Sequence, residues 1–249
     1  MTRGEKEWIQ AELLREEHEK LEQHHCSVFQ TMVNGRVWHL AAIEFGVCIG
    51  LYTLSFWAPQ LLKSVFSGQH SNSSVGALVM IPHLVGILAM VVVSRSSDRL
   101  LERRYHAAIP ALVGGVALLL MGPFHSPLFL VALLSLLAAG VYSVVGPFWA
   151  LPGEFLTGFS AAAGIGLINS VANLGGFVGP YAIGVMSGWT GGIYVGLALA
   201  GIPLLLSATL LCLLPRRAQG GKLVGNRPPI LNHRTKVASS VSLSERIPR

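Results

Sequence analysis

The sequence predicts an all-α integral membrane protein whose six transmembrane helices form one bundle. Its 249 residues are 52% hydrophobic and only 12% charged, with a mean hydropathy of +0.57, whereas about a quarter of the residues in a soluble domain are charged. The apolar residues gather in runs of membrane-spanning length, and 17 of the 18 Lys and Arg residues lie in the leader, the 95–106 connection or the tail. These three observations exclude a soluble domain.

The first two apolar runs have recognisable ends. The first begins after Arg36 and ends among Trp57, Pro59 and Lys63, where an aromatic and a basic side chain favour the membrane interface. The second is interrupted by Pro82. A helix needs about 20 residues to cross the hydrocarbon core. The two runs are therefore expected to span the membrane over residues 37–62 and 75–94.

The other four runs complete the bundle. The third is short and is bounded by His106 and the turn at Gly122-Pro123. The fourth ends at a polar turn with Pro152 and Glu154, which leads into an uncharged fifth run rich in glycine and alanine. Such a helix is expected to allow other helices to approach closely. The expected spans are residues 107–122, 128–150, 161–186 and 192–214.

The two ends of the chain differ from the bundle. Residues 1–36 are expected to form a cytoplasmic linker, with an amphipathic helix over 4–25 that carries seven glutamates and a narrow apolar stripe. No apolar segment of a signal peptide opens the chain. Residues 215–249 have no apolar period and are expected to be disordered.

The placement of basic residues predicts the orientation. Five Lys or Arg residues lie in the leader to Arg36, four in the 95–106 connection and eight in the tail after Pro215, whereas the connections on the opposite side hold only Lys63. The positive-inside rule therefore places both termini in the cytoplasm of a multi-pass protein of the plasma or inner membrane. The net charge of +6 is thus explained by topology, and no nucleic-acid partner is expected.

Several chemistries are not expected. The three cysteines have no paired spacing, which argues against a disulfide framework or a zinc site. No HExxH, GxSxG or P-loop motif occurs, so we expect neither an enzyme nor a cofactor. Four potential metal ligands lie close together in the leader, but without a second ligand cluster they do not predict a metal site. They are His18, His24, His25 and Cys26.

Polar residues within the spans are the candidates for a solute path. Asn169 and Asn173 lie one helical turn apart, and two interpretations stay open: they line the path, or they hydrogen-bond to a neighbouring helix. Glu44 is expected either to face a cavity or to reach the cytoplasmic interface. Tyr52 and Ser55 follow Glu44 on the same side of the first span.

Further residues have more ordinary interpretations. Trp149 is a candidate for the path that is also typical of an interface aromatic. His83 is interpreted as a packed histidine at the Pro82 kink. Gly175 and Gly179, in GxxxG spacing before Pro180, are expected to pack against another helix.

The 95–106 connection carries charges of both signs. Opposite charges near helix ends can pair with neighbouring helix termini and separate in a conformational change, so one interpretation is a cytoplasmic gating loop. The alternative is a plain basic loop that follows from topology alone. The loop residues concerned are Asp98, Arg99, Glu102, Arg103 and Arg104.

Four segments resemble the anion:cation symporter family of the major facilitator superfamily, which includes tartrate, phthalate and sugar-acid carriers. They are GEKEWIQAEL at 4–13, VWHLAAIEFGVCIGLYTLSFWAPQLLK at 37–63, SDRLLERRYH at 97–106 and GEFLTGFSAAAGIGLINSVANLGGFVGPY at 153–181. The resemblance extends from residue 4 to about 215 and implies the C-terminal six-helix half of a twelve-span carrier. Such carriers move one bundle against another around a site near the membrane midplane.

The resemblance also implies roles for individual residues. It implies that Glu44, Tyr52, Trp149 and Asn169 approach the central cavity. The residues that it implies for the second-half copy of the cytoplasmic gating loop are Asp98, Arg99, Arg103 and Arg104.

The implied function is proton-coupled transport of a small organic anion, here by a half-carrier inactive alone. The family's main substrate-binding arginine and proton-coupling acidic residues belong to the first half and are absent from this chain. We therefore expect a partner bundle, and Met1 falls where the linker between halves would run, which suggests a truncated, split or frameshifted gene. One alternative is a membrane scaffold that pairs with other carriers through an exposed GxxxG face. Tartrate-like, sugar-acid and aromatic carboxylates all stay open as substrates.

Overall fold

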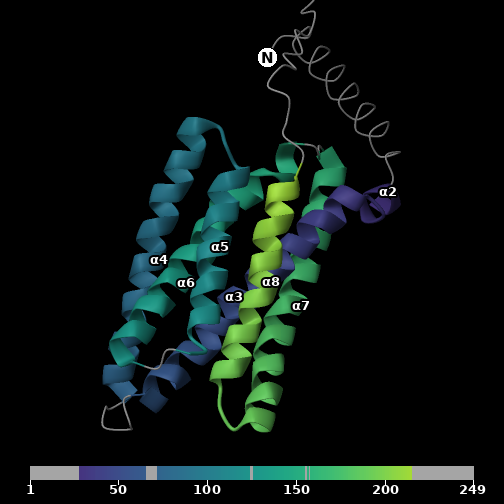
Figure 1. Ribbon diagram of the computed structural model, residues 1–249. Coiled ribbons are helices and arrows are strands. Elements are labelled where there is room, and N and C mark those ends of the chain that lie inside the picture. Colours follow the sequence, from purple (N-terminus) through teal and green to yellow (C-terminus); the bar gives the residue numbers. More distant parts are fainter. Residues whose placement is uncertain (1–27, 66–71, 124–125, 155, 157, 215–249) are drawn as a thin grey trace, which may run out of the picture. The chain divides into compact units, whose positions relative to one another are not determined.

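The computed structural model describes residues 28–65, 72–123, 126–154, 156 and 158–214. The described part is helical and contains no strand, which confirms the all-α prediction (Figure 1). Its elements are α2 (Val28–Met32), α3 (Gly35–Val65), α4 (Asn72–Leu100), α5 (Arg104–Leu120), α6 (Pro127–Ala150), η1 (Pro152–Glu154), α7 (Gly158–Thr190) and α8 (Tyr194–Leu213). The expected helix at 4–25 and the tail at 215–249 lie outside the described residues.

Each expected span coincides with one of the helices α3 to α8, but several ends differ. Helix α4 continues six residues beyond the expected end at residue 94, through the charged segment to Leu100, because charged residues remain good helix formers outside the hydrocarbon. The third span was expected to reach residue 122, whereas α5 ends at Leu120 before the Gly122-Pro123 turn. Helix α7 is longer than expected at both ends.

Five of these helices are long and apolar enough to cross a membrane: α3, α4, α6, α7 and α8. Helix α5 is a shorter apolar helix of 17 residues. At a rise of about 1.5 Å per residue it is about 25 Å long, somewhat less than the hydrocarbon thickness of about 30 Å. The chain is thus a multi-pass membrane protein.

Consecutive long helices alternate in direction, so the α4–α5 turn lies at the same end of the bundle as the end of α8 (Figure 1). A hydrogen bond joins these two places, from Arg104 Nη1 to the Leu214 carbonyl oxygen, at 2.7 Å. Near the same end, His39 Nε2 lies 3.0 Å from the carbonyl oxygen of Leu210. The start of α3, the α4–α5 turn and the end of α8 therefore share one end of the bundle.

The most extensive helix contacts are α3 with α7, α4 with α6, and α5 with both α6 and α8. At the α5–α6 contact the backbones touch at Gly140. A Cβ atom there would lie 2.6 Å from the Pro110 carbonyl oxygen and 2.8 Å from the Gly114 nitrogen, closer than side-chain packing allows. The close approach predicted for small residues in membrane helices therefore occurs here, on α6 as well as on α7.

The α4–α5 turn contains the one described non-glycine residue with a positive φ, Leu101 at 51°. A left-handed conformation costs an L-residue about 1–2 kcal/mol, and the Leu101 side chain is 77% exposed, so packing offsets little of this cost. The strain is therefore stored in the turn.

We expect Leu101→Gly to raise the free energy of unfolding by about 0.5–1 kcal/mol, since the relief of strain exceeds the added freedom of glycine in the unfolded chain. Leu100→Gly is the matched control. It changes a similarly exposed leucine that is the last residue of α4 and should destabilise by up to about 1 kcal/mol. Thermal unfolding in detergent checks both, and equal destabilisation by the two changes would contradict the strained turn.

Candidate functional site

A chain of hydrogen bonds joins polar side chains of α3 and α7. The Tyr52 hydroxyl donates to Asn173 Oδ1 at 3.3 Å, and Asn173 Nδ2 donates to Asn169 Oδ1 at 3.0 Å and to the Asn169 carbonyl oxygen at 2.8 Å. Both asparagines are exposed, and Tyr52 is half-buried. We call these three residues, Tyr52, Asn169 and Asn173, the amide face.

Glycines of α7 position the amide face. At Gly175 a Cβ atom would collide with the carbonyl oxygen of Phe45 on α3, and at Gly176 it would lie 2.7 Å from the Tyr52 ring. The two helices can therefore approach closely, and the Tyr52 ring lies against Gly176 with its hydroxyl within reach of Asn173. The sequence signal for this contact was the run of small residues in the fifth span.

The GxxxG glycines are buried rather than exposed. Gly175 meets Phe45, and a Cβ atom on Gly179 would lie 3.0 Å from the Ile49 side chain, both on α3. The prediction of an exposed GxxxG face, available to other carriers, is therefore wrong, because the first span of the same chain already occupies it.

The other path candidates lie apart from the amide face. Glu44 is only 6% exposed, and its buried Oε2 has no hydrogen-bond partner among the described residues. The Ser55 hydroxyl donates to the Leu51 carbonyl oxygen at 3.0 Å within α3. The half-buried Trp149 contacts Phe148 edge to face, with ring centroids 5.4 Å apart. Among the described residues, no hydrogen bond links Glu44, Ser55 or Trp149 to Tyr52, Asn169 or Asn173.

A second polar pair, between α4 and α6, was missed by the sequence analysis. His83 Nδ1 lies 2.6 Å from the Tyr142 hydroxyl oxygen, and the two rings stack with centroids 5.9 Å apart. Tyr142 precedes Trp149 by seven residues and so shares its face of α6. The spacing of seven residues from Trp149, a candidate for the solute path, was the sequence signal that could have identified Tyr142. His83 is thus a packed residue that also forms a hydrogen bond with the Tyr142 hydroxyl group.

The charged residues of the α4–α5 turn form two pairs. Arg103 pairs with Asp98 and also donates to Ser97 Oγ. Glu102 accepts from His106 Nδ1 at 2.7 Å, and its two carboxylate oxygens accept from the backbone N–H groups of Tyr105 and His106. Specific side-chain contacts therefore stabilise the turn, which also carries positive charge. Arg99 takes no part in these two pairs and lies exposed at the end of α4.

Glu102 caps the first turn of α5. Partial burial acts to raise its pKa, but hydrogen bonds from the Tyr105 and His106 N–H groups and from the His106 ring outweigh this effect and leave the pKa below the ordinary 4.5. A depressed carboxyl pKa contributes stability above the ordinary value, and that stability is lost as the pH falls through the folded-state pKa.

We expect Glu102→Gln to lower the thermal unfolding temperature at neutral pH, because the neutral amide loses the charge-assisted bonds. The difference from the unchanged protein should shrink as the pH falls from 4.5 through the lower pKa of the folded state, below which the carboxylate is protonated in both states. A difference that is the same at both pH values would contradict a role for the charge.

Comparisons with known proteins agree with this architecture. The family model described as Major Facilitator Superfamily matches residues 8–180. A quinolone resistance transporter from Acinetobacter baumannii is 38% identical over 206 residues, which are 83% of this chain and 47% of the relative. A putative tartrate transporter from Agrobacterium vitis is 35% identical over 225 residues, which are 90% of this chain and 51% of the relative. The chain thus spans about half the length of the curated relatives it matches.

A solved structure supports the fold alone. The crystal structure of a mutant of the peptide transporter POT in complex with sulfate aligns with a TM-score of 0.61 at 16% sequence identity, over 83% of this chain and 43% of that one. The family match, the two relatives and the helical bundle lead to the same conclusion. The chain belongs to the Major Facilitator Superfamily of transporters.

Proposed function

We propose that this chain is one six-helix half of a carrier of the anion:cation symporter family, which transports small organic anions such as tartrate-like or sugar-acid carboxylates. In this proposal the amide face of Tyr52, Asn169 and Asn173 lines the solute path. The observation that carries the proposal is that these three side chains form a hydrogen-bonded cluster on an exposed face of two membrane-spanning helices.

Because the amide face is exposed, its surroundings matter, and its polar groups favour contact with a solute path or a partner bundle over contact with lipid. Each asparagine amide has more donors and acceptors than the cluster satisfies, and an unsatisfied polar group in hydrocarbon costs on the order of 1 kcal/mol or more. Water in a solute path, or a second bundle, removes this cost. The neighbouring aromatic side chains Phe177 and Tyr181, stacked 5.7 Å apart, extend the same face and are also exposed.

The distribution of charge supports a carrier that needs a second half. The six apolar runs at 37–62, 75–94, 107–122, 128–150, 161–186 and 192–214 contain no Lys or Arg residue; the basic residues of helices α3, α4 and α5 lie at the helix ends outside these runs. Amide and phenol groups can donate hydrogen bonds to a carboxylate and accept them from hydroxyl groups, but they do not neutralise its charge. We therefore expect the counter-charge to come from the other wall of the path, and this chain to be inactive alone.

Glu44 is the ionisable group that this chain offers for proton coupling. Its side chain is buried in α3 and its Oε2 has no partner in the described part of the chain, which favours a group that holds a proton or meets a partner during transport. The proposed orientation places both termini in the cytoplasm, supported by 17 of the 18 basic residues on that side.

Uptake of radiolabelled tartrate tests the proposal. Cells would express this chain, the portion of the Agrobacterium vitis relative that this chain does not match, or both together. We expect uptake above background only with both. Uptake by this chain alone would contradict the half-carrier, whereas a stable complex without uptake would favour a scaffold that pairs with other carriers.

A further inference from the structure

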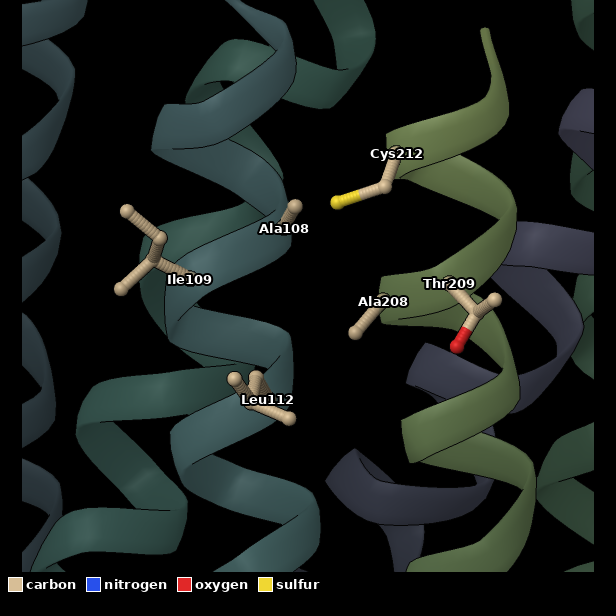
Figure 2. Close-up of a pocket in the computed structure, with 6 residues that line it drawn as sticks. All are labelled: Ala108, Ile109, Leu112, Ala208, Thr209 and Cys212. Atoms are coloured by element: carbon tan, nitrogen blue, oxygen red, sulfur yellow. The ribbon is translucent and has the colours of Figure 1, made fainter.

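A shallow apolar hollow lies between α5 and α8, on helices that do not carry the amide face (Figure 2). Its volume is about 290 Å³. The small side chains of Ala108 and Ala208 leave the gap between the two helices, and the thiol of Cys212 points across it toward α5 (Figure 2). The other lining residues are Ile109, Leu112 and Thr209.

The hollow offers almost no polar group to an occupant. Its one hydroxyl, on Thr209, donates to the Leu205 carbonyl oxygen at 2.9 Å and is therefore satisfied within α8. Ile109 and Leu112 are largely exposed along its side. Because α8 is long and apolar enough to span a membrane and α5 is an apolar helix packed against it, the hollow opens toward hydrocarbon. Its occupant must then be apolar.

A guanidinium group lies one helical turn beyond the lining residues at one end of this hollow. Arg104 is one turn before Ala108 on α5, and its Nη1 donates to the carbonyl oxygen of Leu214, two residues beyond Cys212. The side chain therefore crosses from one lining helix to the other. It also lies over the Tyr105 ring, 5.2 Å from the centroid. Its buried Nε has no hydrogen-bond partner among the described residues.

The charge of Arg104 is not neutralised by the described part of the protein. The two carboxylates of the adjacent turn are engaged elsewhere, Asp98 with Arg103 and Glu102 with His106. Arg104 forms no ion pair with any described residue. An anion at this end would pair with the guanidinium charge.

We infer that this site binds an anionic phospholipid, with one acyl chain in the hollow and the phosphodiester on Arg104. The apolar hollow matches the acyl chain and the guanidinium matches the phosphodiester. The guanidinium lies at the end of the helices, which is where lipid headgroups lie. The guanidinium recognises phosphate oxygens through parallel hydrogen bonds, and basic pockets between transmembrane helices at one membrane face bind lipid headgroups. The site needs no second bundle, so its test does not depend on the proposed transport function.

The test counts lipids bound to the purified full-length chain by native mass spectrometry. The probes are phosphatidylglycerol and phosphatidylcholine with identical acyl chains. We expect phosphatidylglycerol to bind more tightly, and Arg104→Gln to weaken it about five-fold, the effect of one basic residue beside an anionic lipid. Arg95→Gln, which removes an exposed charge from α4, is the matched control and should bind like the unchanged chain.

A second variant tests the acyl chain without altering Arg104. Thr209→Trp fills the hollow and should weaken binding of both lipids, whereas Ile202→Trp, at an exposed position of α8 outside the hollow, should not. Equal loss in Arg104→Gln and Arg95→Gln would overturn the headgroup assignment. Unchanged binding in Thr209→Trp, or full displacement of the lipid by inorganic phosphate, would overturn the acyl-chain assignment.

Discussion

Gly140→Ala is expected to destabilise the bundle strongly, because the added methyl group has no space at the α5–α6 contact. It would lie 2.6 Å from the Pro110 carbonyl oxygen and 2.8 Å from the Gly114 backbone, and backbone atoms cannot move aside as a flexible side chain can. Overpacking of this kind costs about 1–3 kcal/mol and sometimes more. We expect little monodisperse protein to survive moderate heating in detergent, as measured by size-exclusion chromatography.

Gly76→Ala is the matched control for this prediction. Apart from its chain neighbours and the backbone of α4 itself, no atom of the described residues lies within 4 Å of a Cβ atom at Gly76, so the same chemical change meets open space. Alanine should there leave stability unchanged or raise it by up to about 1 kcal/mol through its higher helix propensity. If the two variants lose the same fraction of protein on heating, the close backbone contact at Gly140 is not a source of stability.

Asn173→Leu is expected to lower the kcat/KM for tartrate uptake by the paired carrier about 10- to 100-fold. Asn173 joins Tyr52 to Asn169, so leucine removes its three hydrogen bonds to these two residues. A hydrogen bond to a charged group contributes about 1.5–3 kcal/mol, so a site that loses one such bond to a carboxylate loses this free energy in binding.

Ser170→Ala is the control for the amide face. Ser170 is an exposed residue of the same helix, but its hydroxyl donates only to the Gly166 carbonyl oxygen at 2.8 Å, one turn back. We expect uptake to be unchanged in this variant, with equal amounts of both proteins in the membrane by immunoblot. Normal uptake in Asn173→Leu would exclude the amide face from the solute path.

The positions of the long apolar helices α3 to α8 could be predicted because hydrophobic length is a local property of the sequence. The helix ends could not, since hydropathy falls at Arg95 while the helix of α4 continues to Leu100. Leu101 illustrates the same limit. Nothing in its residue type indicates a left-handed conformation, which arises from the geometry of a turn between two packed helices.

The residues of the site were partly predictable from the sequence, but the hydrogen bonds between side chains of different helices were not. Asn169 and Asn173 stand out because amides are rare in apolar helices, and one helical turn places them together. Their bond to Tyr52 spans 121 residues of sequence and depends on how closely α3 and α7 approach. The pair of His83 and Tyr142 likewise depends on the packing of α4 against α6, which no single span encodes.

A second bundle is expected to cover the amide face, and photo-cross-linking tests this expectation most directly. The photo-reactive residue p-benzoylphenylalanine would replace Phe177, which is 70% exposed one turn beyond Asn173, or Leu206, which is 58% exposed on α8. The chain would be co-expressed with the unmatched portion of the Agrobacterium vitis relative. We expect a protein adduct from position 177 and none from position 206. Equal adduct yields at the two positions, or none at 177, would contradict the account.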